Sequence, residues 1–494
     1  MSVRTGTHEI RFEQTMSDAE ALMWNIEKDP WLNPSGAMIS ILDRPLDIEL
    51  FRARLSTAVA EIPRLRERVV PGFGRLSPPT WATDPEFDFD YHVRHIALPA
   101  PGTERQLLDL STCLYEDPFD RTRPLWMFVC IDGLEGGRGA VFSKMHHTIT
   151  DGIGAIRLSE RYVEAERDAP APASVDLARV IADALAAERA GGPDGANTDS
   201  AAQRGSLRSG FGHIARRHAG FARRTLGEVA TWTGDPVMAR EFAEEMIGAT
   251  KSTIGQLGAP DSGAPSGSDL WSNRSRHRRL ETIGLPLDAV KTAGLALGGS
   301  INDVFVTGAA MGALGYHERR GVNPEGLNAS FVVSTRVDDA IGGNSFVPTK
   351  FLVPVSYESP RKFFVEVRDR MTECRDAVSD DGALRRLAGV ANLLPTSMVT
   401  QMARAQAANI DFATSNLRGA WFPTFMSGAA VQHNIVMGPV AGTAMNITTM
   451  SHNGQLDIGF FIDPAAIDDP DELRECMRTA YRRLLAAGGV DFEG

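Results

Sequence analysis

The sequence predicts a mixed α/β (α+β) protein built from two lobes of similar size. Apolar segments of strand length alternate with segments of helical periodicity before residue 166 and again after residue 271. Two stretches of loop-like composition separate these α/β segments. One is rich in Ala, Asp, Pro, Gly and Ser at 167–205, and the other is rich in Pro, Gly and Ser at 258–269. A chain of 494 residues is also too long for one core. We expect an N-terminal lobe at 1–166, a linker and helical connecting region at 167–270, a C-terminal lobe at 271–494, and a site in the cleft between the lobes.

The first lobe shows helix and strand signals in alternation. Ser17 precedes an apolar-periodic segment and predicts a capped helix over 17–24, and the apolar spacing over 48–62 predicts an amphipathic helix. The predicted strands lie at 38–43, 126–131 and 139–145, the last two joined by a Gly-rich turn. A helix is expected to follow at 153–165.

The second lobe repeats the alternation. Proline at 360 and at 470 marks two helix starts, because the first helical position tolerates a residue without an N–H. We expect helices at 287–297, 304–317, 360–377 and 470–487, and strands at 283–285, 330–334, 351–355, 435–437 and 456–462.

Composition excludes several classes of protein. No uninterrupted apolar run approaches the ~18 residues of a membrane-spanning helix, and the N-terminus lacks the apolar core of a secretory signal. Cysteines at 113, 130, 374 and 476 form no CxxC pair, which suits a reducing compartment. We therefore expect a soluble cytoplasmic protein. The net charge of −12 argues against nucleic-acid binding. No GxGxxG, GxxxxGK[ST] or GxSxG motif occurs.

The most informative feature is His146-His147-Thr-Ile-Thr-Asp151-Gly152, directly after the predicted strand at 139–145. A histidine at a strand end can take a proton from an alcohol near neutral pH. Adjacent histidines on a strand point to opposite faces, so one should face a channel while the other packs behind it. Asp151 should fix the local geometry, and Gly152 should permit a close contact. The alternatives are a pair of core histidines beside a helix cap, or a metal site, for which no third ligand stands at a recognisable spacing.

Further segments carry a family resemblance: Pro124-Leu125-Trp126 before the histidines, Ile301-Asn302-Asp303-Val304 and Gly343-Asn344 after them, and the stretches 87–102 and 414–419. HHxxxDG is the signature of the CoA-dependent acyltransferase superfamily. Together with the other segments it resembles the bacterial wax ester synthase/acyl-CoA:diacylglycerol acyltransferase family over nearly the whole chain. The resemblance implies a two-lobed, chloramphenicol acetyltransferase-like fold, in which an acyl-CoA tunnel meets an alcohol channel at the histidine pair.

The resemblance also implies roles for residues. His147 would be the general base, with acyl-CoA as a substrate, no other cofactor and no metal. Asp151 would be structural and pair with an arginine from early in the chain, for which Arg66 is the expected partner. Pro124, Leu125 and Trp126 are expected to pack or line a channel. Asn302 has two interpretations: it orients substrate or oxyanion from the second lobe, or Ser300, Asn302 or Asp303 merely caps the following helix.

The sequence indicates the type of reaction more clearly than it indicates the acceptor substrate. Thr148 replaces the small apolar residue usual after the second histidine, and Leu417-Arg418 stands where Val-Pro is common. The leading hypothesis is transfer to diacylglycerol or a long-chain alcohol. The alternatives are another alcohol or amine, or a lipid-surface binding protein without turnover. Peripheral contact with the inner membrane or a lipid droplet is expected. The basic amphipathic segment 204–226 is the candidate for this membrane contact. The alternative is that the segment forms a helix packed on its own protein.

Overall fold

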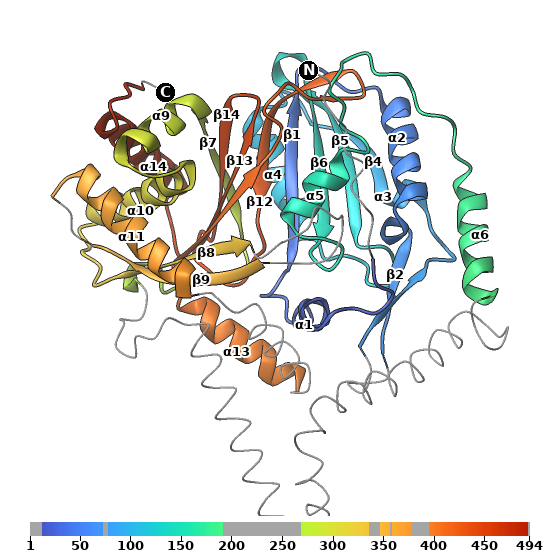
Figure 1. Cartoon of the computed structure of the whole chain (residues 1–494), viewed down its shortest axis with the longest axis horizontal. Helices are drawn as coiled ribbons and strands as arrows, with labels where there is room; N and C mark the ends of the chain where they lie inside the picture. The colour runs from blue at the N-terminus through green and yellow to red at the C-terminus, as the bar shows by residue number, and fades with distance from the viewer. Residues whose placement is uncertain are drawn as a thin grey trace, which may run out of the picture.

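The computed structural model describes residues 12–72, 78–190, 268–334, 346–355, 358–377 and 395–492. These residues form two six-stranded sheets flanked by helices, and one small two-stranded sheet (Figure 1). The predicted segment 204–226 and the Gly343-Asn344 pair lie outside the described residues.

The first sheet has the strand order β11-β12-β1-β6-β5-β4. Its strands are β1 (Ser35–Leu42), β4 (Val93–Ala97), β5 (Trp126–Leu134), β6 (Arg138–His146), β11 (Phe425–Met426) and β12 (Ala429–Met437). Helix α2 (Ile48–Glu61) packs on the face that carries Phe128 and Cys130 of β5, and α4 (Glu104–Glu116) packs on the face that carries Met127 and Val129. This alternation buries β5 on both sides.

The remaining elements of the first lobe lie around this sheet. They are helices α1 (Asp18–Ile26), α3 (Phe89–His92), α5 (Gly152–Ser159) and α6 (Leu177–Ala190), strands β2 (Glu67–Val70) and β3 (Thr80–Thr83), and the short 3-10 turns Pro63–Leu65 and Glu135–Gly137. Ser17 and Glu20 form the capping box of α1, as the N-cap signal predicted.

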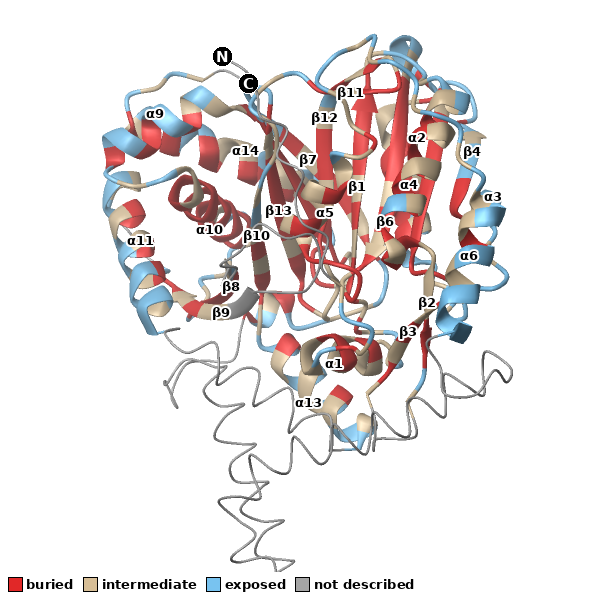
Figure 2. Ribbon diagram, turned by 45° about the vertical axis from the view of Figure 1, so that its right-hand side comes forward, coloured by how far each residue is buried: buried red, intermediate tan, exposed pale blue. Residues whose placement is uncertain are grey.

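The second sheet has the order β7-β14-β13-β10-β8-β9. Its strands are β7 (Arg279–Pro286), β8 (Leu327–Ser334), β9 (Phe346–Val353), β10 (Phe412–Arg418), β13 (Met445–His452) and β14 (Gln455–Ile462). Its helices are α9 (Leu287–Leu297), α10 (Ile301–Arg319), α11 (Pro360–Ala377), α13 (Thr396–Ala408) and α14 (Pro470–Ala487), after a 3-10 turn at Asp269–Trp271. Helix α10 is buried along most of its length between the other helices and the sheet (Figure 2).

The two halves of the chain are interleaved. Strands β11 and β12 come from the second half but belong to the first sheet, and β12 pairs antiparallel with β1 from Ala37↔Met437 to Leu42↔Val431. Asp457 of β14 joins the two sheets, because its carboxylate accepts hydrogen bonds from His433 Nδ1 at 2.9 Å and Asn434 N at 2.8 Å, both on β12. The expected boundary at residue 271 therefore separates the lobes along the chain only in part.

Two element predictions need correction. The helix after the motif ends at Ser159 rather than near residue 165, because the chain then turns and Glu164 bridges to Phe425 of β11. The segment expected as a linker contains helix α6, whose first turn is capped by Asp176 and whose Glu188 accepts hydrogen bonds from Thr83.

Candidate active site

Strand β6 carries the histidine pair to the end of a central strand. His146 is the last residue of β6, lies opposite Ser35 of β1, and donates its N–H to Leu125 O at 3.0 Å. His147 leaves the sheet in a turn, where its N–H donates to Pro34 O at 3.0 Å. Backbone bonds from two neighbouring segments therefore fix both histidines.

His146 is fully buried, and its Nδ1 is held by the neighbouring Thr148. Its Nδ1 accepts the Thr148 N–H at 3.1 Å and lies 2.7 Å from Thr148 Oγ1. Because Nδ1 accepts, a neutral ring carries its proton on Nε2, which lies 3.4 Å from Glu27 Oε2 without completing a hydrogen bond. Thr148, a departure from the family pattern, thus holds His146 in place.

Glu27 follows helix α1 and is the partner that sequence reasoning missed. Its carboxylate also accepts from Arg121 Nη1 at 2.9 Å, and the Arg121 guanidinium stacks over Trp24 at 3.3 Å. Burial alone would raise the pKa of Glu27, but the neighbouring His146 and the positive charge of Arg121 hold it below its ordinary value. No local pattern marks an acid at a helix end for this role.

We expect Glu27→Ala to destabilise the fold by about 1 kcal/mol, because it leaves the partly buried Arg121 guanidinium without this acceptor. Glu27→Gln, which keeps an acceptor oxygen, should recover most of the loss. Urea denaturation of the two variants beside the wild type measures this, and equal losses in both would contradict the role of the acceptor.

His147 is half-buried, and its ring lies beside a glycine. A Cβ added at Gly36 of β1 would stand 3.6 Å from His147 Nε2. The missing side chain therefore leaves space next to the ring nitrogen, on the side of β1. This arrangement leaves room for another group to approach Nε2.

Asp151 is the N-cap of helix α5. It is 5% exposed, and its Oδ1 accepts the Gly154 N–H at 2.9 Å. The expected ion pair between Asp151 and Arg66 does not form between these two described residues, so that prediction was wrong. Arg66 instead donates from Nη1 to Val59 O at 2.8 Å and Ala60 O at 2.9 Å, carbonyls that the end of α2 leaves without helical partners.

Gly152 brings the second lobe against the motif. A Cβ at this position would lie 2.9 Å from Leu417 Cδ2 on β10, so the glycine lets the strand approach closely. The neighbouring Asn416 donates from Nδ2 to Asn302 Oδ1 at 3.2 Å. A short series of contacts thus runs from the motif through β10 to the start of α10.

The helix-cap interpretation applies to Ser300 and Asp303, which form a capping box at α10. Asp303 Oδ2 accepts from Ser300 N and Oγ, both at 2.8 Å. Asn302 takes no part in this cap, and its side chain faces Asn416 instead.

Pro124, Leu125 and Trp126 lie buried behind the histidines. The Trp126 indole donates to Leu65 O at 2.7 Å and stacks on His92 with ring centroids 4.4 Å apart. Burial lowers the pKa of His92 to about 4, so this histidine is neutral at physiological pH.

Lys144, also on β6, is a buried cation two residues before His146. Its Nζ donates to Asp117 O and, at 3.4 Å, to Leu114 O, and it lies 4.6 Å from the Phe119 ring centre. Burial lowers its pKa to about 8, although Glu27 and Asp117 act in the opposite direction.

The depressed pKa of Lys144 predicts a pH effect. Between pH 8 and its unfolded pKa the unfolded chain binds more protons, so stability should rise with pH there. Relative to Lys144→Met, the free energy of unfolding should increase by about 2 kcal/mol from pH 8 to pH 10. Guanidinium titrations of both proteins at several pH values measure the difference, and a pH-independent difference would contradict it.

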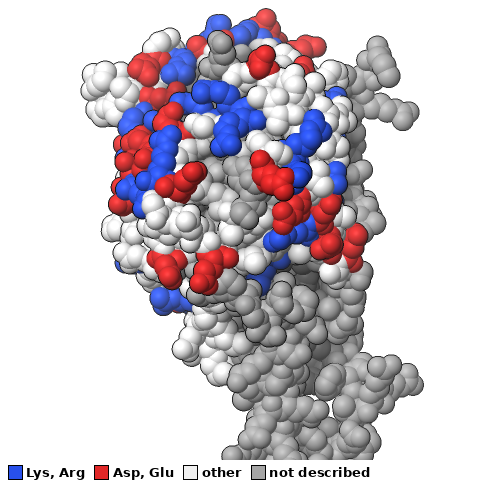
Figure 3. Space-filling model, turned by 90° about the vertical axis from the view of Figure 1, so that its left-hand side faces the viewer, with Lys and Arg blue, Asp and Glu red and all other residues white. Residues whose placement is uncertain are grey.

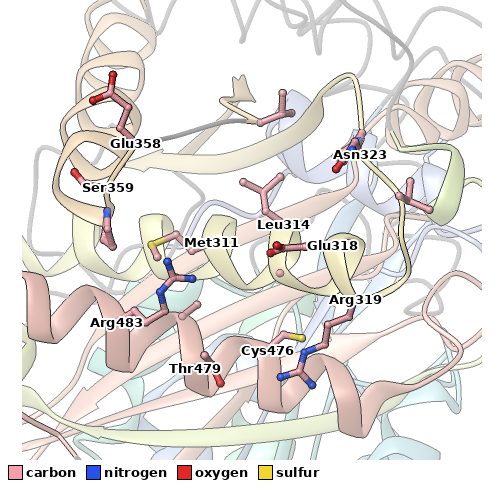
Figure 4. A pocket seen from close by; sticks show the side chains of 16 residues that line it. Met311, Leu314, Glu318, Arg319, Asn323, Glu358, Ser359, Cys476, Thr479 and Arg483 are labelled. Atoms are coloured by element: carbon pink, nitrogen blue, oxygen red, sulfur yellow. The ribbon is translucent and has the colours of Figure 1, made fainter.

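A pocket of about 520 Å³ lies elsewhere, between α10, α14 and the start of α11 (Figure 4). Its lining includes Met311, Arg319 and Arg483 but no residue of the motif. On the face of the second lobe seen in Figure 3, acidic and basic side chains are interspersed. Within the described ranges no three His, Cys, Asp or Glu side chains cluster as a metal site.

Comparison with known protein families and structures shows which family the chain belongs to. The model of the wax ester synthase/diacylglycerol acyltransferase catalytic domain matches residues 16–305, and that of the WS/DGAT C-terminal domain matches residues 342–485. Two Mycobacterium tuberculosis relatives are each named "Putative diacylglycerol O-acyltransferase". One is 27% identical over 481 residues, covering 97% of this chain and 93% of the relative; the other is 30% identical over 434 residues, covering 87% and 89%.

Solved structures share the fold at low identity. The wax ester synthase/diacylglycerol acyltransferase from Marinobacter aquaeolei VT8 superposes with a TM-score of 0.62 at 18% identity, covering 96% of this chain and 100% of that one. A variant starter condensation domain of rhizomide synthetase, in complex with C8-CoA, gives 0.55 at 16% identity, covering 96% and 94%.

The interleaved lobes, with HHxxxDG at the end of a central strand, have the fold that wax ester synthases and condensation domains share. Within that class, the chain belongs to the wax ester synthase/diacylglycerol acyltransferase family, since the catalytic-domain match alone covers more than half of it.

Proposed function

We propose that this enzyme transfers a long-chain acyl group from acyl-CoA to diacylglycerol, forming triacylglycerol, or to a long-chain alcohol, forming a wax ester. The observation that carries the proposal is His147 in the turn directly after β6, with its Nε2 beside Gly36, in a chain of this family. The names of the M. tuberculosis relatives support diacylglycerol as acceptor.

In the proposed reaction, His147 takes the hydroxyl proton of the acceptor while that oxygen attacks the thioester carbonyl. The tetrahedral intermediate then expels the CoA thiolate, which receives the proton from His147. An ester and free CoA result, with no acyl-enzyme and no cofactor besides the acyl-CoA substrate. Asn302, joined to β10 through Asn416, would orient substrate from the second lobe.

His146, Thr148 and Glu27 would act behind the reacting ring. The contacts of Thr148 with His146 Nδ1 fix the turn that carries His147, and the fully buried His146 ring is shielded from substrate. Asp151 and Gly152 would set the start of α5 and the approach of β10.

Because the acceptors are nearly insoluble in water, the enzyme would meet them at a membrane or lipid-droplet surface. None of the described helices is long and apolar enough to span a bilayer. We propose that the contact with this lipid surface is peripheral.

The test is CoA release from palmitoyl-CoA with dioleoylglycerol, with hexadecanol and without acceptor, with the ester identified by mass spectrometry. Stimulation by either acceptor supports the proposal and names the preferred class. If neither stimulates release, the proposed acceptors are wrong, and short alcohols and amines become the next substrates to try.

A further inference from the structure

The loop 419–424, between β10 and β11, carries an exposed tryptophan next to a half-buried phenylalanine. Trp421 is 77% exposed, more than any other large apolar side chain in the described ranges. The Phe422 ring packs edge-on against it with centroids 5.5 Å apart. Exposing so large an apolar surface to water is unfavourable unless a partner covers it.

The loop is held at both ends. At its start, Gly419 N donates to Ser451 O and Asn453 N donates to Ala420 O, both at 2.9 Å. At its end, Thr424 Oγ1 lies 2.8 Å from His452 Nε2. A Cβ at Gly419 would stand 2.7 Å from Ser451 O, so the glycine lets the loop lie against β13. The exposure of Trp421 is therefore built into the fold.

The same loop begins next to the contact between the second lobe and the motif. Leu417, which packs on Gly152, precedes Arg418, and Trp421 follows three residues later. Arg418 is exposed, and no described acidic group pairs with its guanidinium. An exposed arginine that pairs with no described acidic group thus stands three residues before Trp421 in the chain.

We propose that Trp421 and Phe422, with Arg418, form the surface by which this protein binds lipid membranes. Tryptophan is amphipathic and favours the boundary between headgroups and acyl chains, while arginine binds lipid phosphate. Binding here would hold the protein at the surface in which its proposed acceptors are dissolved. The inference rests on the proposed function, because a lipid acceptor gives the contact its purpose.

Co-sedimentation of the full chain with vesicles tests the surface. Trp421→Ser should weaken binding to phosphatidylcholine vesicles containing phosphatidylglycerol by about tenfold, and Trp421→Phe should retain most of it. Leu295→Ser is the matched control, because Leu295 is 70% exposed but lies on α9. Arg418→Gln should weaken binding only when phosphatidylglycerol is present. Unchanged binding by Trp421→Ser, or an equal loss in Leu295→Ser, would overturn the inference.

Binding is measured without acyl-CoA, so the two proposals fail separately. If the wild type binds vesicles through Trp421 but transfers no acyl group, the proposed function alone is wrong. If Trp421→Ser keeps the wild-type apparent KM for diacylglycerol in vesicles, the lipid contact alone is wrong. A raised KM with kcat maintained supports the contact, since a general loss of structure would lower kcat as well.

Discussion

Replacing His147 by alanine should lower kcat for acyl transfer by about 10²–10⁴-fold while the protein remains folded. The loss follows from removing the group that accepts the hydroxyl proton. The fold should survive because the side chain is only half-buried and faces the space left by Gly36. The measurement is the rate of ester formation from palmitoyl-CoA and the better acceptor, at saturating concentrations of both.

A second variant separates chemistry from packing. His147→Gln keeps much of the side-chain volume and a hydrogen-bonding amide but has no basic nitrogen, so it should be as inactive as the alanine variant. Thermal unfolding of both should match the wild type. A glutamine variant with nearly full turnover would show that His147 positions substrate rather than accepting a proton.

Much of the secondary structure could be predicted from local signals. The bounds of α11 and α14 match because Pro360 and Pro470 mark their first turns, and α9 ends where Gly298 takes a left-handed conformation. Strands β10 and β13 were not predicted. Their sequences mix Asn, Ser and Thr with apolar residues, so burial in the sheet rather than local preference makes them strands.

Some residues of the candidate site could likewise be predicted from the sequence, and others could not. The histidine pair, Asp151 and Gly152 could be found because they lie together in the sequence. Glu27, Gly36 and Leu417 reach the same place from α1, β1 and β10, and no spacing connects them to the motif. The strand pairing that brings them together is a property of the whole fold.

The wrongly predicted partner of Arg66 has a related physical cause. The first lobe contains several arginines near the end of α2, and the sequence does not distinguish an ion-pair partner from a residue that caps a helix. In the structure Arg66 binds two carbonyls at the end of α2, and its neighbour Arg64 pairs with Glu67 at 3.2 Å. Both carbonyls lie only a few residues before Arg66 in the chain, so these hydrogen bonds form without any long-range arrangement.

Asp151→Ala should lower the free energy of unfolding by about 2 kcal/mol, at the upper end for loss of an N-cap, because the Gly154 N–H that it satisfies is buried. Catalysis should fall as well. Helix α5 begins at Gly152, where β10 packs, so a frayed first turn would loosen the contact between the lobes beside His147. Urea unfolding and kcat, measured on the same preparation, test both effects.

Asp151→Asn distinguishes the cap from an ion pair. Asparagine caps helices as well as aspartate does but carries no charge. If capping is the main role, the asparagine variant should recover most of the stability that alanine loses, and added salt should change the wild type and this variant equally. If it is instead as unstable as alanine, the negative charge is what the fold requires. In that outcome the N-cap seen in the structure would be secondary to an electrostatic role of Asp151.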